Sequence, residues 1–443
     1  MPAAIRERAI LVGLELRGRL GRRAGSASEL DDFDSEESIE ELAALAESAG
    51  AEILSSIVQS REAPEAATLI GSGKLDELRT QAEATEADVV IFDRDLSPTQ
   101  LRNLEKALPC RVVDRTQLIL DIFARRAHTR EGQLQVELAQ LNYLLPRLTG
   151  RGVAMSRLGG GIGTRGPGET QLETDRRRIA GRIRKIEDNL EAVRSGRSVQ
   201  RRQRQAVPLA TIGLVGYTNA GKSTLFNRLT GAGVLADAKM FATLDPTVRQ
   251  FTLPSNRRVL LSDTVGFIRN LPTTLVKAFR ATLEEVTEAA VLLHVVDVAA
   301  PQASSYVEHV SAVLKEIGAE STPQILVLNK LDLLPEGESR EAAQARVLGA
   351  AGPVRTAVPV SARTGAGMAD LLAQIDAMLP VDPVSRAVFR IPHESGSDIH
   401  FLHEYARVIE RRDEGEYSEI LAEAPESVQK RLARFRCADR KDA

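Results

Sequence analysis

The stretch ATIGLVGYTNAGKSTLFNRLTG (residues 210–231) decides the fold of the central part of this chain. An apolar, strand-like run comes first, a glycine-containing loop follows, and a helix-like segment closes the stretch. The loop matches the pattern G-x-x-x-x-G-K-[ST], in the strand–loop–helix context that this pattern requires. Its glycines let the backbone wrap around phosphate groups, and the free amides at a helix start favour negative charge. The loop consists of Gly216, Tyr217, Thr218, Asn219, Ala220, Gly221, Lys222 and Ser223, with Thr224 next in the helix.

Three further segments follow predicted strands in the same part of the chain. Asp263-Thr264-Val265-Gly266 lies at the end of the run VLLSDT, where a carboxylate can reach Mg²⁺ through water and the Gly266 amide can sense a γ-phosphate. Asn329-Lys330-Leu331-Asp332 follows QILVLN, and the Asp332 carboxylate can accept two hydrogen bonds from guanine, which adenine cannot donate. Ser361-Ala362-Arg363 follows VPVS, and its backbone can meet the guanine O6. Ligands bind at the carboxyl ends of strands in open α/β sheets, so these segments predict a GTP site.

A loop between these segments must supply a hydroxyl group to Mg²⁺. Residues 241–247 read FATLDPT and contain two threonines, Thr243 and Thr247. A γ-phosphate orders such a loop in GTPases. The spacing does not choose between the two threonines.

Phe267 occupies the position after D-x-x-G, where Ras-like proteins carry a glutamine that orients the attacking water. A phenylalanine cannot orient water, and we expect it to pack in the core. We therefore predict slow intrinsic hydrolysis, with another domain or a partner completing the site. An unchanged single-turnover rate after removal of residues 1–206, and with any candidate partner, would contradict this.

Hydrophobic periodicity divides the 443 residues into four parts. Strands and helices alternate in residues 1–125, which predicts a small parallel-sheet α/β domain. Residues 126–206 predict a long antiparallel helical arm, with residues 159–168 (GGGIGTRGPG) as its tip. Residues 207–380 predict a doubly wound P-loop GTPase domain, and residues 381–443 a small α+β domain. The fold class is α/β.

The net charge of −3 hides a strong asymmetry. Residues 1–140 hold 17 basic and 26 acidic side chains, whereas residues 141–206 hold 15 basic and 6 acidic ones. A uniformly basic nucleic-acid binder is excluded, but a local basic patch is not. The basic residues of the arm favour contact with phosphates over a merely solvated helix face. The candidate RNA contacts of the helix are Arg176, Arg177, Arg178, Arg182 and Arg184. For the tip with Arg165 the sequence alone favours a plain hinge, and Arg165 becomes a candidate RNA contact only by the family resemblance given below.

The acidic stretch of residues 29–41 (ELDDFDSEESIEE) predicts a flexible or solvated loop, which should avoid phosphates. Cys110 and Cys437 show neither a pairing pattern nor metal-ligand spacing, which favours a reducing cytoplasm. No apolar run is long enough for a membrane helix, and no signal peptide is evident at the start.

Several long strings outside the phosphate-binding loop are specific to one family. They are residues 68–74 (TLIGSGK), 92–98 (FDRDLSP), 115–123 (RTQLILDIF), 132–141 (GQLQVELAQL), 161–177 (GIGTRGPGETQLETDRR) and 241–245 (FATLD). Together with the loop GYTNAGKS, they show that the chain resembles the HflX family of ribosome-associated GTPases over about residues 10–380. Residues 381–443 are less diagnostic.

The resemblance implies binding to the rRNA of the large ribosomal subunit and GTP-dependent splitting of idle or stalled ribosomes. It also implies ATP as a second substrate of some members, and an arm tip that approaches the peptidyl-transferase region. It assigns Mg²⁺ to Ser223 and Thr243, and catalytic roles to Lys222, Thr243 and Gly266. The nucleotide site extends by the same resemblance to Phe241, Ala242, Thr243, Leu244 and Asp245.

Two other functions stay open on the sequence. One is a ribosome-assembly or RNA-remodelling GTPase that uses the same binding mode. The other is a regulatory switch that acts on a protein or membrane partner, although the arm lacks the broad apolar face of an interfacial helix. We expect a monomer, no DNA binding and at most peripheral membrane association.

Overall fold

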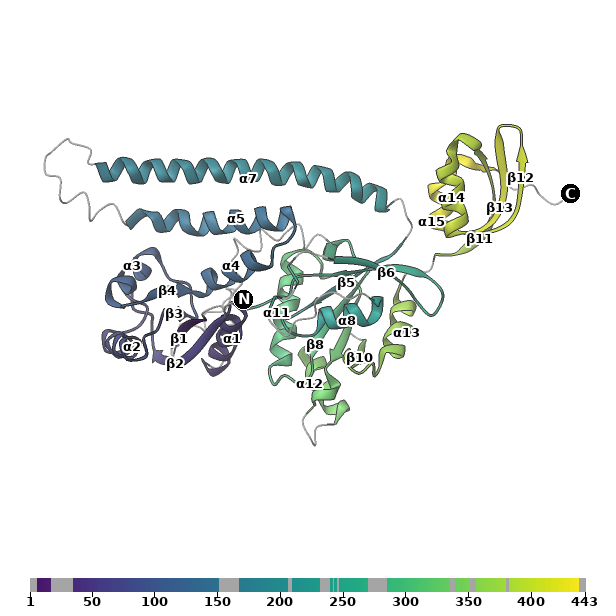
Figure 1. The fold of residues 1–443 in the computed structure, drawn as a ribbon. Helices are drawn as coiled ribbons and strands as arrows, with labels where there is room; N and C mark the ends of the chain where they lie inside the picture. Colours follow the sequence, from purple (N-terminus) through teal and green to yellow (C-terminus); the bar gives the residue numbers. More distant parts are fainter. Residues whose placement is uncertain are drawn as a thin grey trace.

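The computed structural model describes most of the chain in four parts that follow one another along the sequence (Figure 1). The described residues are 6–16, 35–150, 167–205, 209–231, 240–241, 243–244, 247–269, 285–334, 339–350, 356–379 and 382–437.

The N-terminal part is built on a four-stranded parallel sheet with the order β2-β1-β3-β4. Its inner strands β1 and β3 are apolar and buried on both sides, as expected for strands of a parallel sheet that helices cover on both faces. Ala9 and Leu11 of β1 enter one core with α1 and α4, whereas Ile10 and Val12 enter another with α2 and α3. The predicted parallel α/β domain is therefore confirmed. Its elements are β1 (Glu7–Leu16), α1 (Ser35–Ser48), β2 (Ala51–Arg61), α2 (Ser72–Thr85), β3 (Val89–Phe92), α3 (Pro98–Ala107), β4 (Arg111–Asp114) and α4 (Arg115–Arg126).

The second half of the acidic stretch is not a solvated loop, so that prediction was wrong for the part that the structure describes. Helix α1 begins at Ser35, and both Ile39 and Glu41 are buried. Apolar residues recur through this helix at Ile39, Leu42 and Leu45, and they pack against the sheet. Residues 29–34 lie outside the described residues.

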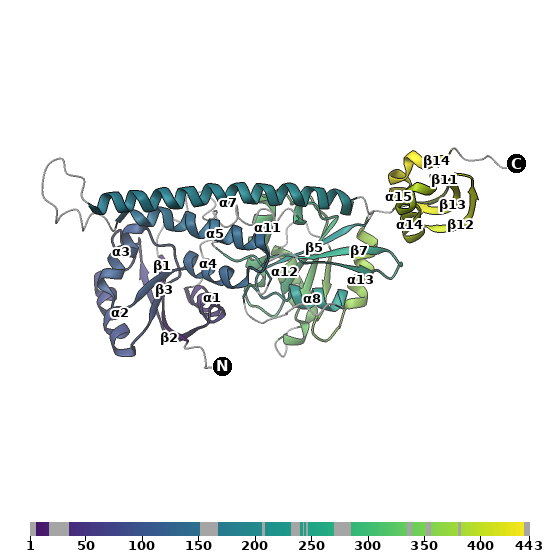
Figure 2. The same cartoon turned by 45° about the horizontal axis from the view of Figure 1, so that its top comes forward.

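The arm consists of two helices that run side by side, α5 (Arg130–Leu144) and α7 (Pro167–Gln205), with η2 (Leu145–Gly150) after the first (Figures 1 and 2). Ile186 and Leu190 of α7 are buried, as the narrow apolar stripe predicted. Arg182 of α7 forms a bidentate ion pair with Glu137 of α5, with distances of 2.6 and 2.9 Å. The predicted helical hairpin is confirmed, but its glycine-rich tip, residues 151–166, lies outside the described residues.

The third part is a six-stranded sheet with the order β10-β9-β8-β5-β7-β6. Helices α8 and α13 cover one face, where Phe226 and Leu371 are buried, and α11 and α12 cover the other, where Val307 and Val347 are buried. The elements are β5 (Thr211–Gly216), α8 (Lys222–Thr230), β6 (Thr247–Thr252), β7 (Arg258–Asp263), β8 (Val291–Asp297), α11 (Ala303–Glu316), β9 (Gln324–Asn329), η3 (Leu331–Leu333), α12 (Arg340–Ala350), β10 (Ala357–Pro359) and α13 (Met368–Met378).

Strand β6 is the one strand of this sheet that the sequence did not predict. It pairs antiparallel with β7 at the edge of an otherwise parallel sheet. An antiparallel edge strand is common in doubly wound folds, so the predicted class holds.

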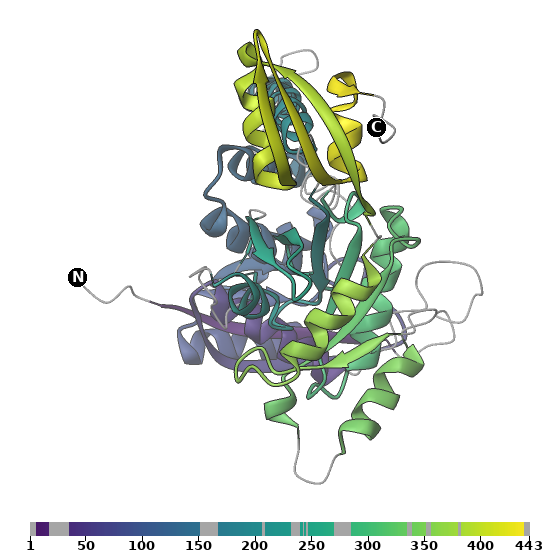
Figure 3. The same ribbon diagram turned by 90° about the vertical axis from the view of Figure 1, so that its right-hand side faces the viewer.

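The C-terminal part is an antiparallel sheet with the order β12-β13-β11-β14, packed against α14 and α15 (Figure 3). The chain order β-α-β-β-α-β with this strand order is the ferredoxin-like arrangement, which confirms the predicted α+β class. An ion pair of 3.5 Å between Arg258 and Glu404 joins this part to β7. The elements are β11 (Val384–Pro392), η4 (His393–Ser395), α14 (Gly396–Tyr405), β12 (Arg407–Glu414), β13 (Tyr417–Pro425), α15 (Glu426–Arg431), η5 (Ala433–Phe435) and β14 (Arg436–Cys437).

Among the described residues, no helix has the length and apolar character needed to cross a lipid bilayer.

Candidate nucleotide site

The loop between β5 and α8 has a backbone that only glycine can supply at two points. Gly216 has φ +148°, and a Cβ there would lie 2.3 Å from the carbonyl oxygen of Val295. Gly221 has φ +92°, and a Cβ there would lie 2.3 Å from the side-chain nitrogen of Asn329. Positive φ and close backbone approach both exclude larger residues. The loop therefore curls tightly over the carboxyl edge of the sheet, as phosphate binding requires.

Lys222 opens α8 and is buried beneath this loop. Its Nζ donates to the carbonyl oxygens of Gly216 at 3.1 Å and Tyr217 at 2.8 Å. Burial lowers the pKa of Lys222 to about 8, against an opposing effect of the Asp263 charge. No carboxylate of the described residues lies within ion-pairing distance of Nζ, so a phosphate would supply the anion that this buried cation lacks.

Three oxygen-bearing side chains meet in front of Lys222. The hydroxyl oxygens of Ser223 and Thr243 lie 2.8 Å apart, and each lies 2.9 Å from Oδ2 of Asp263. The other carboxylate oxygen of Asp263 is buried without a hydrogen-bond partner, and burial raises the pKa of Asp263. Hydroxyl and carboxylate oxygens are the ligands that Mg²⁺ prefers, so this group fits the ion. Thr247, the other candidate, is the first residue of β6.

The segment after Asp263 lies directly against the phosphate-binding loop. The Thr264 hydroxyl donates to the carbonyl of Leu214 at 2.5 Å, and a Cβ on Gly266 would lie 2.9 Å from Nζ of Lys222. Thr218 N donates to Phe267 O at 2.7 Å, and Phe267 N donates to Gly216 O at 3.1 Å. The Phe267 side chain is buried in the core, as predicted.

The segments that were predicted to read guanine also lie together. Asn329 Nδ2 donates to Ala220 O at 2.9 Å, and Asn329 Oδ1 accepts from Ala362 N at 2.9 Å. This buried amide thus joins the phosphate-binding loop to the 361–363 segment. The Ser361 hydroxyl donates to Asp332 at 2.5 Å, which holds the carboxylate in place for a base.

Most of the predicted site residues thus surround one edge of the sheet. Leu244 is buried nearby, whereas Asn219, Arg363 and Leu331 are more exposed at the rim. Ala242 and Asp245 lie outside the described residues. The structure brings together Gly216, Tyr217, Thr218, Ala220, Gly221, Lys222, Ser223, Thr224, Phe241, Thr243, Asp263, Thr264, Val265, Gly266, Asn329, Lys330, Asp332, Ser361 and Ala362.

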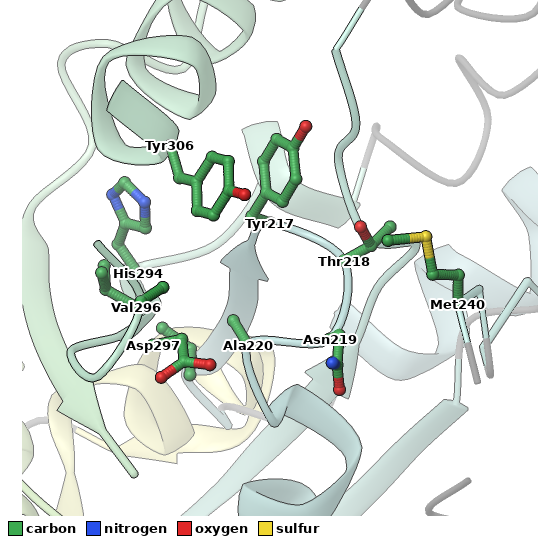
Figure 4. Close-up of a pocket in the computed structure, with 11 residues that line it drawn as sticks. Tyr217, Thr218, Asn219, Ala220, Met240, His294, Val296, Asp297 and Tyr306 are labelled. Atoms are coloured by element: carbon green, nitrogen blue, oxygen red, sulfur yellow. The ribbon is translucent and has the colours of Figure 1, made fainter. Parts of the chain in front are cut away.

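The sequence missed several residues beside the phosphate-binding loop. A cavity of about 210 Å³ lies between this loop, β8 and α11 (Figure 4), and Tyr217 stacks on Tyr306 there, with ring centroids 4.0 Å apart. Asp297, at the end of β8, forms an ion pair of 2.7 Å with Lys330. Its place after a buried strand is the same signal that found Asp263 and Asn329. His294 is buried in the middle of β8, and burial lowers its pKa to about 3.

The arginines predicted to contact RNA differ in their surroundings. All five that the structure describes are exposed on α7, but Arg182 is paired with Glu137, Arg177 with Glu173, and Arg178 more loosely with Asp175 at 3.9 Å. Arg176 and Arg184 form no ion pair with a described residue. Arg165 lies outside the described residues. The Glu137 pair gives Arg182 a structural role in the arm that the sequence did not indicate.

The doubly wound sheet and the segments along its edge define a P-loop GTPase. Three family models match the chain: GTP-binding GTPase N-terminal over residues 36–124, GTP-binding GTPase Middle Region over residues 126–204, and 50S ribosome-binding GTPase over residues 211–330. The chain belongs to the HflX family of GTPases.

Two relatives show how far this similarity extends. GTPase HflX of Caldanaerobacter subterraneus is 46% identical over 407 residues, which cover 91% of each chain. GTPase HflX of Alkalihalophilus pseudofirmus is 56% identical over 302 residues, which cover 68% of this chain and 71% of the relative. Among solved structures, a GTP-binding protein of Sulfolobus solfataricus in complex with GDP is 25% identical, with a TM-score of 0.44 and coverage of 84% of this chain and 98% of that chain.

Proposed function

We propose that this protein hydrolyses GTP with Mg²⁺ and uses GTP on the large ribosomal subunit to separate idle or stalled ribosomes in the cytoplasm. The observation that carries the proposal is the run of exposed arginines on α7, in a chain whose third part brings together the nucleotide-binding segments. Relatives named GTPase HflX, and the family model described as a 50S ribosome-binding GTPase, support the choice of partner.

Each part of the nucleotide site has a role in this proposal. Lys222 binds the β- and γ-phosphates, Gly266 contacts the γ-phosphate, and Asp332 accepts hydrogen bonds from guanine. Ser223 and Thr243 bind Mg²⁺, which neutralises charge on the phosphates. ATP is a second and weaker substrate, because adenine lacks the two donors that Asp332 accepts.

The basic arm would hold the protein on rRNA. Exposed cations bind phosphates regardless of base sequence, and their binding weakens steeply with salt. Arg176 and Arg184 are exposed and free of ion pairs with described residues, so they can meet phosphates without breaking such a pair. Arg182 would have to leave Glu137 first.

Sedimentation of ribosomes with the protein and a non-hydrolysable GTP analogue tests the proposal. Separation of intact ribosomes into subunits, with the protein on the large subunit, supports it. Binding mainly to immature subunits would instead indicate an assembly or RNA-remodelling GTPase. Absence of comigration would indicate a switch that acts on a protein or membrane partner.

A charge-reversal pair tests the arm. Arg176→Glu with Arg184→Glu should weaken large-subunit binding and lower the slope of log affinity against log salt by about two, because each arginine would neutralise one phosphate. Lys315→Glu with Arg340→Glu changes the net charge equally on exposed positions of α11 and α12 and is the control. Equally weakened binding in the two variants would mean that total charge, and not the arm, governs binding.

A further inference from the structure

A group of charged side chains is buried where the N-terminal domain meets the phosphate-binding loop. Glu41 of α1 is at its centre: one carboxylate oxygen lies 2.5 Å from Arg115 and 3.5 Å from Nε of Arg269. The other accepts a hydrogen bond from the hydroxyl of Tyr217. Side-chain exposure is 6% for Glu41, 3% for Arg115 and 10% for Arg269. A buried carboxylate between two guanidinium groups is held firmly, because each buried charge requires its partners.

Tyr217 and Arg269 belong to the two segments that meet the phosphates. Tyr217 directly follows Gly216 in the loop, and Arg269 comes three residues after Gly266. The Tyr217 hydroxyl accepts from Arg269 N at 3.0 Å while it donates to Glu41. Burial, with a further effect of the Glu41 charge, raises the pKa of Tyr217 well above its usual value, so the hydroxyl keeps the proton that it donates.

Glu41 therefore fixes the distance between the phosphate-binding loop and the segment that carries Gly266. The backbone bonds between Thr218 and Phe267 hold the near end of that segment, and Glu41 with its partners holds its far end at Arg269. Phe267 leaves this segment without a side chain that orients water, so the placement of the Gly266 amide matters more than usual.

The same helix reaches the third nucleotide-binding segment. Ser48 lies seven residues after Glu41, two turns along α1 and on the same face. Its hydroxyl accepts a hydrogen bond from Met240 N at 2.9 Å, three residues before Thr243. One face of α1 thus contacts the segments of Tyr217, Thr243 and Gly266.

We propose that Glu41 is a positioning residue for GTP hydrolysis: it acts through Tyr217 and Arg269 to place the Gly266 segment against the phosphate-binding loop. The role rests on the GTP hydrolysis proposed above, and it makes the N-terminal domain part of the hydrolytic site. It also gives a physical route by which movement of that domain changes the rate.

The full-length protein with Glu41→Gln tests this role. The substitution keeps the size of the side chain and an oxygen for Tyr217 but removes the charge that Arg115 and Arg269 require. We expect single-turnover GTP hydrolysis to fall about tenfold, since small displacements at a reacting centre cost factors of this order. Affinity for GDP should stay within about twofold, because GDP has no γ-phosphate for Gly266 to contact. Glu40→Gln, one residue away and exposed, is the matched control.

Tyr217→Phe is a second variant, which removes one hydroxyl and leaves the ring on Tyr306. It should slow hydrolysis to a similar extent, and the double variant should be no slower than the slower single variant, because Glu41 and Tyr217 hold the same end of the segment at Arg269. Independent, additive effects on the rate would overturn the proposal. So would a wild-type rate in Glu41→Gln, or a fall in GDP affinity as large as the fall in rate.

The ratio of the affinity for a non-hydrolysable GTP analogue to the affinity for GDP tests this inference separately from the proposed function. Absence of hydrolysis in the wild-type protein would overturn the proposed function. In that case Glu41→Gln should still lower the ratio of analogue affinity to GDP affinity by about tenfold, because the Gly266 amide is no longer positioned for the γ-phosphate. An unchanged ratio would overturn the role of Glu41.

Discussion

The rings of Phe123 and Phe241 meet edge to face, with centroids 4.6 Å apart and planes inclined by 76°. Phe123 belongs to α4 of the N-terminal domain, and Phe241 lies two residues before Thr243. Both side chains are buried in one continuous core that also contains Tyr217 and Phe267. The two domains thus share a core beside the segments that we propose to bind the nucleotide, and we expect nucleotide binding and domain packing to be coupled.

A double-mutant cycle on this pair measures the coupling. Phe123→Leu and Phe241→Leu should each lower the free energy of unfolding. The decrease in the double variant should be smaller than the sum of the two single decreases by about 0.5–1.5 kcal/mol, which is the value of an aromatic pair beyond its burial. Urea unfolding followed by tyrosine fluorescence gives the four stabilities. Phe389→Leu, buried in the separate C-terminal core, should combine additively with Phe123→Leu. Full additivity of Phe123→Leu and Phe241→Leu would show that the rings do not interact in solution.

Lys222→Ala should abolish GTP hydrolysis and weaken nucleotide binding severely. The substitution removes the only side-chain cation that the described residues place beneath the phosphate-binding loop, where burial leaves little water to compensate. Fluorescence titration with a labelled GDP and a phosphate-release assay measure the two effects. Lys315→Ala, on the exposed side of α11, should behave as wild type. Turnover that persists in Lys222→Ala would remove the assignment of this loop to the phosphates.

Much of this site followed from the sequence because buried parallel strands end at one edge of a sheet. Asp263 and Asn329 end such strands and Ser361 follows one, and the structure places them along the edge of the sheet that carries the phosphate-binding loop, as expected. Glu41 could not be found in this way. It lies 176 positions before Tyr217, in a stretch whose composition is typical of a solvated loop, and its partners come together only when two domains pack.

Strand β6 and the role of Arg182 were missed for related reasons. Strand β6 carries exposed polar residues such as Arg249 and Gln250 where the predicted strands are apolar, so its pairing with β7 decides its conformation. Arg182 belongs to a run of basic residues that look equivalent in the sequence. Only the register of α7 against α5 brings it to Glu137.

Nucleotide affinity should fall as the pH rises above neutrality. Burial lowers the pKa of Lys222 to about 8 in the nucleotide-free protein, and bound phosphates must raise it again. Above pH 8 the free protein has given up this proton and must regain it on binding. Affinity for GDP should therefore fall about fourfold between pH 7 and pH 8.5, with proton uptake that increases over the same range.

Calorimetry in buffers of different ionisation enthalpy measures both the affinity and the protons taken up. The range ends at pH 8.5 so that the guanine base keeps its own N1 proton. Lys222→Arg is the control, because a guanidinium group stays charged throughout and should show no proton uptake from this position. A constant affinity with no proton uptake in the wild-type protein would mean that Lys222 keeps its charge without nucleotide.

Asp332→Asn should shift base preference from guanine towards xanthine. A carboxylate accepts from both N1–H and the exocyclic amino group of guanine, whereas an amide can accept from one and places its own donor against the other. GDP binding should weaken by about 3 kcal/mol, or roughly a hundredfold. Xanthine carries an oxygen in place of the amino group and can accept from the amide of Asn.

The Ser361 hydroxyl, which donates to Asp332 at 2.5 Å, can still donate to the amide oxygen of Asp332→Asn, so the side chain should keep its position. Competition of xanthosine and guanosine diphosphates for a labelled nucleotide measures the change, with Asp370→Asn, at an exposed position of α13, as the control. Equal GDP affinity in Asp332→Asn and Asp370→Asn would mean that another group reads the base.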